Sequence, residues 1–316
     1  MSESPTAPAN EDDAPPAGEL SRGAFAIVFA VSVITAAGNT GMQSVLPAIG
    51  RESNIPDFMV AAIFSLSALL WAIGAPFWAR QADIRGRKPL ILLGLGGFVI
   101  SMICCGVVVS AGVRHWGTPM IIFILFLLAR ALFGLFGSAA NPASQAYLAE
   151  RTSRERRTTA IASLAGAFGL GTIVGPAVAP LFVLPVVGLA GPMFIFAALA
   201  AGVYVWVQFG LTETWTGAPA GARPKPAGEP TVKPTPLWKD PRVTPFLLYG
   251  LLVSTCQTAQ YQTLGFIIID KLGLPPIQAQ GYTAAAMMAG AGAGLFAQWG
   301  LIRVFRMGPR HLLLWG

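Results

Sequence analysis

The chain has 316 residues, of which 54% are hydrophobic and only 11% are charged, and its formal net charge is +7. Soluble domains contain about 25% charged residues, and a soluble fold of this size cannot hide so much apolar surface from water. The composition therefore indicates a membrane protein and excludes a soluble enzyme, a nucleic-acid binder and a secreted disulfide scaffold. Three cysteines and two isolated histidines predict neither a disulfide framework nor a metal site, so no cofactor is expected.

The chain begins with a polar, proline-rich stretch, residues 1–23, which is predicted to be a disordered cytoplasmic tail. Eight stretches then reach the length of about 20 apolar residues that a helix needs to cross a bilayer core. These spans are residues 24–46, 59–79, 90–111, 119–140, 159–182, 192–211, 244–269 and 282–304. A ninth stretch begins at His311. The predicted fold class is an all-α polytopic membrane bundle.

The positions of the basic residues predict the orientation of this bundle. With the N-terminus in the cytoplasm, 17 of the 21 lysines and arginines fall in cytoplasmic segments and 3 in outside loops, while Arg130 lies within a span. This asymmetry follows the positive-inside rule. It predicts a multi-pass protein of the inner (plasma) membrane with a cytoplasmic N-terminus. The basic charge then reflects orientation in the lipid bilayer, and nucleic acid is not an expected partner.

Residues 212–243 are predicted to form a cytoplasmic linker, because they are rich in proline, glycine, alanine and lysine. This linker separates a six-helix bundle at residues 24–211 from a partial bundle at residues 244–316, which holds helices 7 and 8 and the start of helix 9. Six spans, a linker and further spans are the plan of a carrier built from two six-helix halves.

The loop between the second and third spans carries the most specific motif. Residues 79–88, A-R-Q-A-D-I-R-G-R-K, resemble the G-x-L-A-D-R-x-G-R-K loop of the major facilitator superfamily (MFS), with matches at Asp83, Gly86, Arg87 and Lys88. Three positions depart from the pattern, namely Ala79, Gln81 and Ile84. The resemblance implies a gating loop, in which Asp83 faces a helix terminus of the second half. The alternative is a positive-inside loop with a turn at the glycine.

Arg130 lies in the fourth span, in a segment R-A-L-F-G that is similar to the family's R-x-x-x-G element. A charged arginine deep in hydrocarbon costs at least about 2.5 kcal/mol, so Arg130 is expected to face a polar cavity or a partner. It either holds substrate or tunes a proton site, or it is a structural group bonded to backbone carbonyls.

The fifth span contains Gly171-T-I-V-Gly175-Pro176, which resembles the G-x-x-x-G-P motif of the drug/proton antiporter-like exporter branch of the same superfamily. Small residues let membrane helices approach closely, so these glycines predict either general helix packing or a contact with the small-residue run at 289–294 of the eighth span. Leu211-Thr-Glu213-Thr214, after the sixth span, resembles the family's L-P-E-T.

In this family the first, fourth and seventh helices help to line a central cavity. The polar residues that these spans contribute are Asn39, Gln43, Arg130, Gln257, Gln260 and Tyr261. Polar groups at such depth need partners or water, so they either line a substrate cavity or bond one helix to another. No Asp or Glu lies in the middle of a span, which leaves open whether protons are the coupling ion.

The resemblance thus implies a transporter and not an enzyme, one that exports drugs or other small molecules by alternating access. A twelve-helix carrier needs about 400 residues, so the chain is expected to be truncated after its eighth helix. The alternative is a polytopic membrane protein that transports nothing, such as a remnant or a regulatory or assembly subunit. An open reading frame with four more apolar spans after Gly316 would favour the carrier.

Overall fold

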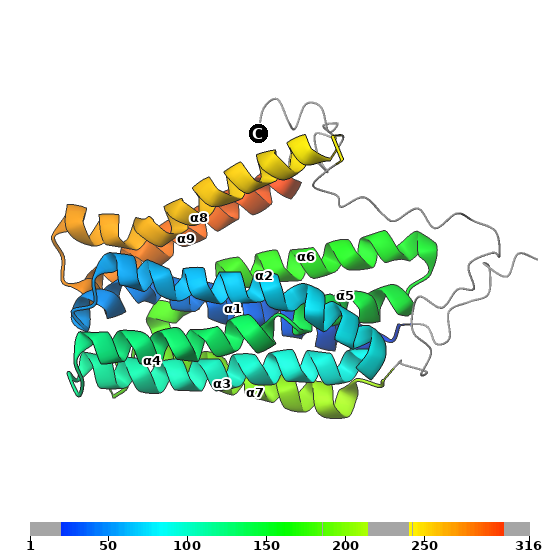
Figure 1. Ribbon diagram of the computed structural model, residues 1–316, viewed down its shortest axis with the longest axis horizontal. Coiled ribbons are helices and arrows are strands. Elements are labelled where there is room, and N and C mark those ends of the chain that lie inside the picture. The colour runs from blue at the N-terminus through cyan, green and yellow to red at the C-terminus, as the bar shows by residue number, and fades with distance from the viewer. Residues whose placement is uncertain (1–19, 185, 214–239, 242, 300–316) are drawn as a thin grey trace, which may run out of the picture.

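The computed structural model describes residues 20–184, 186–213, 240–241 and 243–299. Most of the predicted tail, most of the predicted linker and the start of a ninth helix at His311 lie outside the described residues. The regular structure of the described chain is helical, apart from one isolated β-bridge between Leu184 and Gly188. The predicted all-α polytopic bundle is confirmed (Figure 1).

The helical elements follow one another with short connections. In chain order they are α1 (Arg22–Glu52), α2 (Asp57–Arg85), α3 (Arg87–Val113), α4 (Pro119–Leu132), the π-helical turn η2 (Phe133–Gly137), α5 (Ala140–Glu150), α6 (Arg154–Val178), the 3-10 turn η3 (Ala179–Phe182), α7 (Gly191–Gly210), α8 (Thr244–Leu272) and α9 (Pro276–Trp299). The side chain of Ser21 caps α1 by accepting a hydrogen bond from the Ala24 amide at 3.1 Å, so the helix begins two residues before the predicted span.

Six helical stretches of the described chain are long and apolar enough to cross a membrane, and they correspond to the first six predicted spans. The last two predicted spans coincide with α8 and α9, whose described residues are less apolar. In α8 the reason is a group of glutamines, Gln257, Gln260 and Gln262, near the middle of the helix. That α8 and α9 cross the membrane stays a prediction.

The fourth span differs from its prediction as one helix over residues 119–140. It is built from α4, η2 and α5 and continues to Glu150. The π-helical turn occurs where Gly134 packs against α2, since a Cβ at this position would lie only 2.5 Å from the Ser67 carbonyl oxygen. Such turns re-aim the following helix and often occur near functional sites. Here the turn brings α5 into the bundle beside α6.

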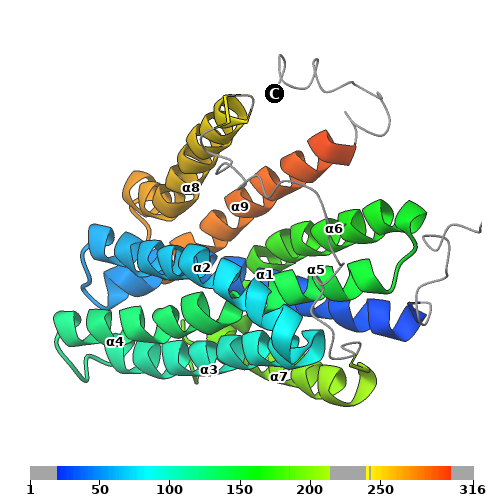
Figure 2. The same cartoon turned by 45° about the vertical axis from the view of Figure 1, so that its right-hand side comes forward.

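Helix α1 lies at the centre of the bundle and packs against α6, α7 and α9. Two ends of the bundle are named here by their residues: the Arg51 end, where α1 is followed by α2, and the Asp83 end, where α2 is followed by α3. Helices α8 and α9 lie close to the other helices at the Arg51 end and diverge from them toward the Asp83 end (Figures 1 and 2).

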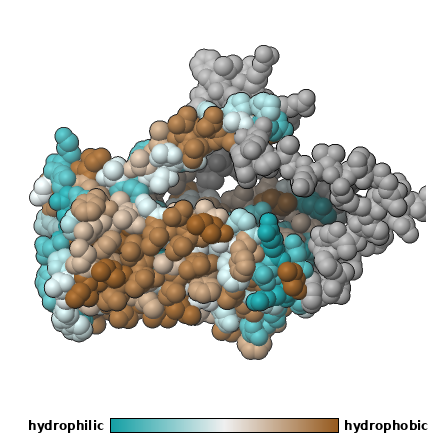
Figure 3. All heavy atoms as spheres, in the orientation of Figure 1, coloured by the Kyte–Doolittle hydropathy of each residue, from teal (hydrophilic) through white to brown (hydrophobic). Residues whose placement is uncertain are grey.

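The outer surface of the bundle carries large apolar side chains. One stripe on α4 consists of Met120, Ile121, Ile124, Leu125 and Leu128, each at least 44% exposed. Figure 3 shows a continuous apolar surface over α4 and α3. Because soluble monomers rarely expose apolar patches of this extent, the surface is suited to contact lipid.

Gly171 and Gly175, the glycines of the segment that resembles the exporter motif, were expected either to serve general helix packing or to contact the small-residue run at 289–294. Although α6 and α9 do lie against each other, Gly171 and Gly175 face α1. A Cβ on Gly171 would lie 2.7 Å from the Ala36 Cβ, and one on Gly175 would meet the backbone at Ala37 and Gly41. The small residues of α1 leave room for this close approach. Pro176 follows within the last turn of α6, which then changes to η3.

Candidate functional site

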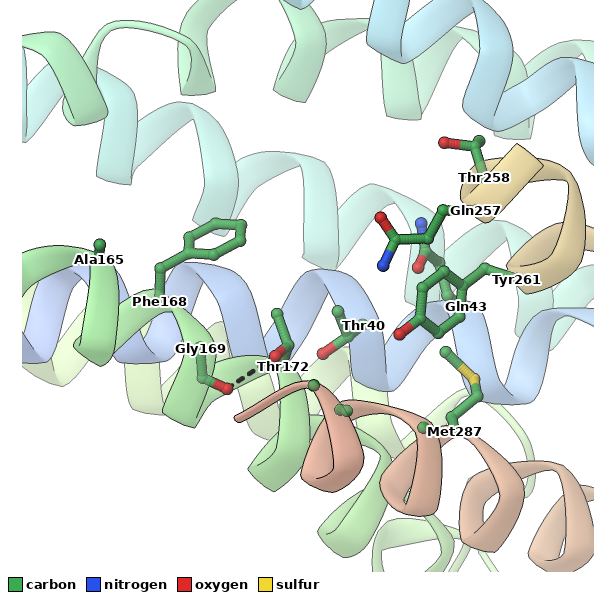
Figure 4. A pocket seen from close by; sticks show the side chains of 13 residues that line it. Thr40, Gln43, Ala165, Phe168, Gly169, Thr172, Gln257, Thr258, Tyr261 and Met287 are labelled. Atoms are coloured by element: carbon green, nitrogen blue, oxygen red, sulfur yellow. Dashed lines mark hydrogen bonds between the residues drawn. The ribbon is translucent and has the colours of Figure 1, made fainter. Parts of the chain in front are cut away.

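A cavity of about 420 Å³ lies between α1 and α6 on one side and α8 and α9 on the other (Figure 4). Its polar wall consists of Thr40, Gln43, Thr172, Gln257, Thr258 and Tyr261, and its apolar wall includes Phe168 and Met287. None of the described lining residues is charged. The volume falls in the range of about 300–1,000 Å³ that small-molecule sites occupy.

The structure brings three of the six predicted cavity residues together in this wall. Gln43 comes from α1. Gln257 and Tyr261 lie one turn apart on α8, and their side chains point toward Gln43 in Figure 4. Gln260 is not among the described lining residues, because the lining face of α8 is centred on the side that Gln257, Thr258 and Tyr261 share, and Gln260 lies at its edge. Asn39 is also outside the described lining.

The threonine hydroxyls of the wall are held by the backbone of their own helices. Thr40 Oγ1 donates to the Ala36 carbonyl at 2.9 Å, and Thr172 Oγ1 donates to the Gly169 carbonyl at 2.7 Å. Each hydroxyl oxygen keeps lone pairs to accept a hydrogen bond from a bound molecule. The amides of Gln43 and Gln257 supply both donors and acceptors. The wall can therefore bind neutral hydroxyl, amide and carbonyl groups.

Arg130 lies behind the cavity wall rather than in it. Its side chain is 1% exposed, and its Nη2 donates to Asn39 Oδ1 at 2.7 Å. The guanidinium carbon lies 4.7 Å from the ring centroids of both Phe64 and Phe133, an arrangement typical of cation–π contact. Arg130 is not among the described residues that line this cavity, and it contacts the asparagine and the two rings instead. A role for Arg130 in substrate binding stays a prediction. Its hydrogen bond to Asn39 connects it to the cavity-lining helix α1.

A second cavity, of about 260 Å³, lies between α1, α5 and α6. It shares Ala165 and Phe168 with the first cavity, and it continues along α6 toward the Asp83 end. Asn141 and Gln145 form its polar side, with Gln145 Nε2 donating to Asn141 Oδ1 at 3.1 Å. Neither residue was predicted to line a cavity, because the fourth span was expected to end at residue 140.

The motif at the Asp83 end forms an ion-pair chain. Asp83 Oδ1 lies 2.7 Å from Arg87 Nη1, and Arg87 Nη2 lies 2.6 Å from Glu150 Oε1 at the end of α5. The Arg87 side chain is only 3% exposed, so both carboxylates offset the cost of burying its charge. These contacts join α2, α3 and α5. A contact of Asp83 with the second half stays a prediction.

Glu213 completes the Asp83 end by capping α3. Its carboxylate accepts hydrogen bonds from the backbone amides of Arg87 at 3.1 Å and Lys88 at 3.0 Å. Lys88 Nζ donates to the Gln208 carbonyl of α7 at 2.6 Å. Gly86, at φ +98°, makes the reversal in a single residue, and a Cβ there would lie 2.7 Å from the Glu213 carboxylate. Glu213, which was noted only as part of the L-T-E-T resemblance, thus contacts the start of α3 at the predicted gating loop.

A cluster of charged residues joins the helices at the Arg51 end. The sequence did not indicate this cluster. Arg51 Nη2 lies 2.8 Å from Asp57 Oδ2 of α2 and 3.0 Å from Asp270 Oδ1 of α8. The Arg51 guanidinium also lies 5.8 Å from the ring centroid of Phe266. The cluster connects the first six spans to α8.

Several known transport proteins are similar to this chain. Multidrug resistance protein MdtG of Proteus mirabilis (strain HI4320) is 27% identical over 195 residues, which cover 60% of this chain and 45% of that protein. The class B tetracycline resistance protein of Escherichia coli is 27% identical over 197 residues, covering 60% and 44%. Multidrug resistance protein 2 of Bacillus subtilis (strain 168) is 30% identical over 173 residues, covering 55% and 39%. The chain spans less than half the length of these relatives.

A solved structure shares the fold. The crystal structure of a POT family transporter in complex with a thioalcohol-conjugated peptide superposes with a TM-score of 0.50 at 17% identity, over 76% of this chain and 46% of that one. Residues 28–316 match the Major Facilitator Superfamily, which is most of the chain. Together with the gating-loop motif and the helical bundle, this match shows that the chain is a multi-pass membrane protein of the Major Facilitator Superfamily, a family of transporters and not of enzymes.

Proposed function

We propose that the chain serves the export of drugs or other small molecules by alternating access. The observation that carries this proposal is the uncharged 420 Å³ cavity between α1 and α6 on one side and α8 and α9 on the other. Relatives named for multidrug and tetracycline resistance support a drug-like substrate. The hydroxyl and amide wall suits molecules that carry hydrogen-bonding groups on an apolar body.

The arrangement of the two ends supports the alternating-access part of the proposal. Helices α8 and α9 approach the other helices at the Arg51 end and diverge from them at the Asp83 end, and the space-filling view shows an opening between them (Figure 3). If the Asp83 end is cytoplasmic, as the basic residues predict, this is an inward-facing state. Substrate then enters from the cytoplasm past Asn141 and Gln145. Export requires closure of the Asp83 end and separation of Arg51 from Asp270.

Reconstituted transport tests the proposal. The full chain is placed in proteoliposomes with a tetracycline-like drug, a lipophilic cation or a sugar inside or outside, with and without a pH gradient. Saturable movement of the drug is expected, and stimulation by the gradient would support protons as the coupling ion. The double variant Gln43→Ala/Gln257→Ala should lose this movement, whereas Gln278→Ala, an exposed glutamine of α9 outside the cavity, should keep it.

A correctly inserted wild-type chain that moves none of these compounds would contradict the proposal. It would favour the alternative of a membrane protein that transports nothing by itself. Transport that survives in the double variant would instead separate the function from this cavity.

A further inference from the structure

A third hollow lies on the outer face of the bundle, away from the two cavities described above. It has a volume of about 520 Å³ and runs along α3 beside η2 and α7. The residues that line it are Pro89, Leu92, Leu93, Gly96, Gly97, Ile100, Phe136 and Tyr204. Six of them follow the i, i+3, i+4, i+7 spacing of a single helix face. This α3–α7 groove is separate from the residues assigned to transport, apart from its proximity to Lys88.

Two adjacent glycines make the groove. Gly97 lets η2 approach α3, since a Cβ there would lie 2.5 Å from the Phe136 Cβ. Gly96 leaves open space instead, because a Cβ there would meet only Tyr204 Cε2, at an ordinary 3.5 Å. The groove therefore has a tightly packed floor and an unfilled volume above Gly96. In a membrane an unfilled apolar groove is occupied by hydrocarbon.

The length of the groove matches one leaflet. From Pro89 to Ile100 the α3 axis rises by about 16 Å, at about 1.5 Å per residue. Half of a hydrocarbon core of about 30 Å is about 15 Å. The groove starts beside the polar Asp83 end and stops near the middle of the predicted span 90–111. It thus has the dimensions of a single acyl chain from the leaflet at the Asp83 end.

A basic group stands at the polar end of the groove. Lys88 precedes Pro89, and its Nζ reaches across to the Gln208 carbonyl on α7, one turn beyond Tyr204. One of the three ammonium donors is used in this bond, and two remain. The Glu213 carboxylate accepts hydrogen bonds from the backbone amides of Arg87 and Lys88. The ammonium is therefore placed to contact a lipid phosphate.

We propose that the α3–α7 groove is a binding site for one anionic phospholipid of the leaflet at the Asp83 end. An acyl chain fills the volume over Gly96, and the phosphate contacts Lys88. Bound lipid bridges α3, η2 and α7, and so it supports the helix that begins at the predicted gating loop. An anionic headgroup is favoured over a zwitterionic one because basic side chains at a membrane surface attract anionic lipid.

Native mass spectrometry of the purified full chain tests the site with two lipids of identical chains, dioleoylphosphatidylglycerol and dioleoylphosphatidylcholine. One molecule of the anionic lipid should remain bound at collision energies that remove the zwitterionic one. Gly96→Leu should lower its retention at least about tenfold, because the side chain occupies the place of several methylenes. Gly202→Leu is the matched control, since Gly202 lies on α7 with no atom within 4 Å of its added Cβ. Lys88→Gln should reduce the preference for the anionic headgroup about fivefold.

A second measurement does not require the protein to fold with a leucine at position 96. In a background without native cysteines, Gly96→Cys fits the groove, and the anionic lipid should slow its reaction with a maleimide, while Gly202→Cys should be unaffected. Equal retention of the two lipids by the wild type, or lipid binding unchanged by Gly96→Leu, would overturn the proposal. A dimer that Gly96→Leu dissociates would show instead that a second copy of the chain occupies the groove.

Discussion

The Arg51 guanidinium and the Asp270 carboxylate lie 3.0 Å apart, although 219 positions separate them in the chain. They join the end of α1 to the end of α8, at the one bundle end where α8 and α9 stay close to the other helices (Figure 1). Both side chains are partly exposed, at 35% and 60%, so the pair contributes about 0.2–1 kcal/mol. A weak link of this kind suits an end that opens in the proposed alternating-access cycle.

Asp270→Asn should favour opening of the Arg51 end. In a background without native cysteines, a thiol introduced by Thr40→Cys should react faster with a membrane-impermeant reagent added at the Arg51 side, by up to about fivefold. Asp57→Asn is the matched control, because it removes the contact between α1 and α2 and leaves the contact with α8. Equal acceleration by both variants would show that the Asp270 contact does not hold the end closed.

Arg130→Met should separate stability from transport. Replacing a buried charge with an apolar side chain of similar volume is often neutral or stabilising, so the melting temperature in detergent should stay the same or rise. Transport should be lost, because Asn39 loses the donor that holds it at 2.7 Å. Arg130→Lys keeps the charge without the planar contact to Phe64 and Phe133, and it should retain only part of the rate. Normal transport by the methionine variant would make Arg130 a structural residue.

Asp83→Asn should reduce transport while membrane insertion and helix content stay unchanged. The fold should tolerate this change, within about 1 kcal/mol, because Arg87 keeps its contact with Glu150 at 2.6 Å. Glu150→Gln is the comparison, and it should cost more stability, since it weakens the shorter contact of an arginine that is only 3% exposed. Proteoliposome flux and thermal unfolding measure the two effects. An Asp83→Asn variant with the wild-type rate would leave the loop as a turn without a gating role.

Gly86→Ala should destabilise the chain more than Gly273→Ala. Both glycines have positive φ, +98° and +61°, but only Gly86 is packed, with the Glu213 carboxylate 2.7 Å from the site of an added Cβ. Nothing lies within 4 Å of an added Cβ at Gly273. The backbone conformation at Gly86 alone costs about 1–3 kcal/mol for another residue. Thermal unfolding in detergent should show the difference, and equal losses would mean that the contact with Glu213 is not maintained.

The topology is tested by labelling introduced cysteines from each side of the membrane. His115→Cys, in an exposed connection between α3 and α4, should react only from outside the cell, and Thr231→Cys only from the cytoplasm. The reason is the excess of basic residues in the segments predicted to be cytoplasmic. Reaction of position 115 from the cytoplasmic side alone would reverse the assigned orientation and, with it, the inward-facing interpretation.

The sequence by itself determined the features that depend on a short stretch of chain. The first six predicted spans correspond to six helical stretches that are long and apolar enough to cross a membrane, because the need for about 20 apolar residues is a local property. The fourth stretch continues ten residues beyond its predicted end, to Glu150. The loop at Asp83 and Gly86 was located from ten consecutive residues, and the positive φ of Gly86 agrees with the predicted turn. The family followed from the same short motifs, and residues 28–316 confirm it.

Only the tertiary structure decided which side chains meet. Lipid and protein interior are similarly apolar, so the sequence of a membrane helix says little about which face turns inward. For this reason Gln43 and Tyr261 reach the cavity while Gln260 does not, and Gly171 packs against α1 instead of α9. The contacts of Arg51 with Asp270 and of Glu213 with α3 join residues more than a hundred positions apart. Their geometry depends on how the helices tilt and rotate against one another, and no local pattern in the chain encodes that.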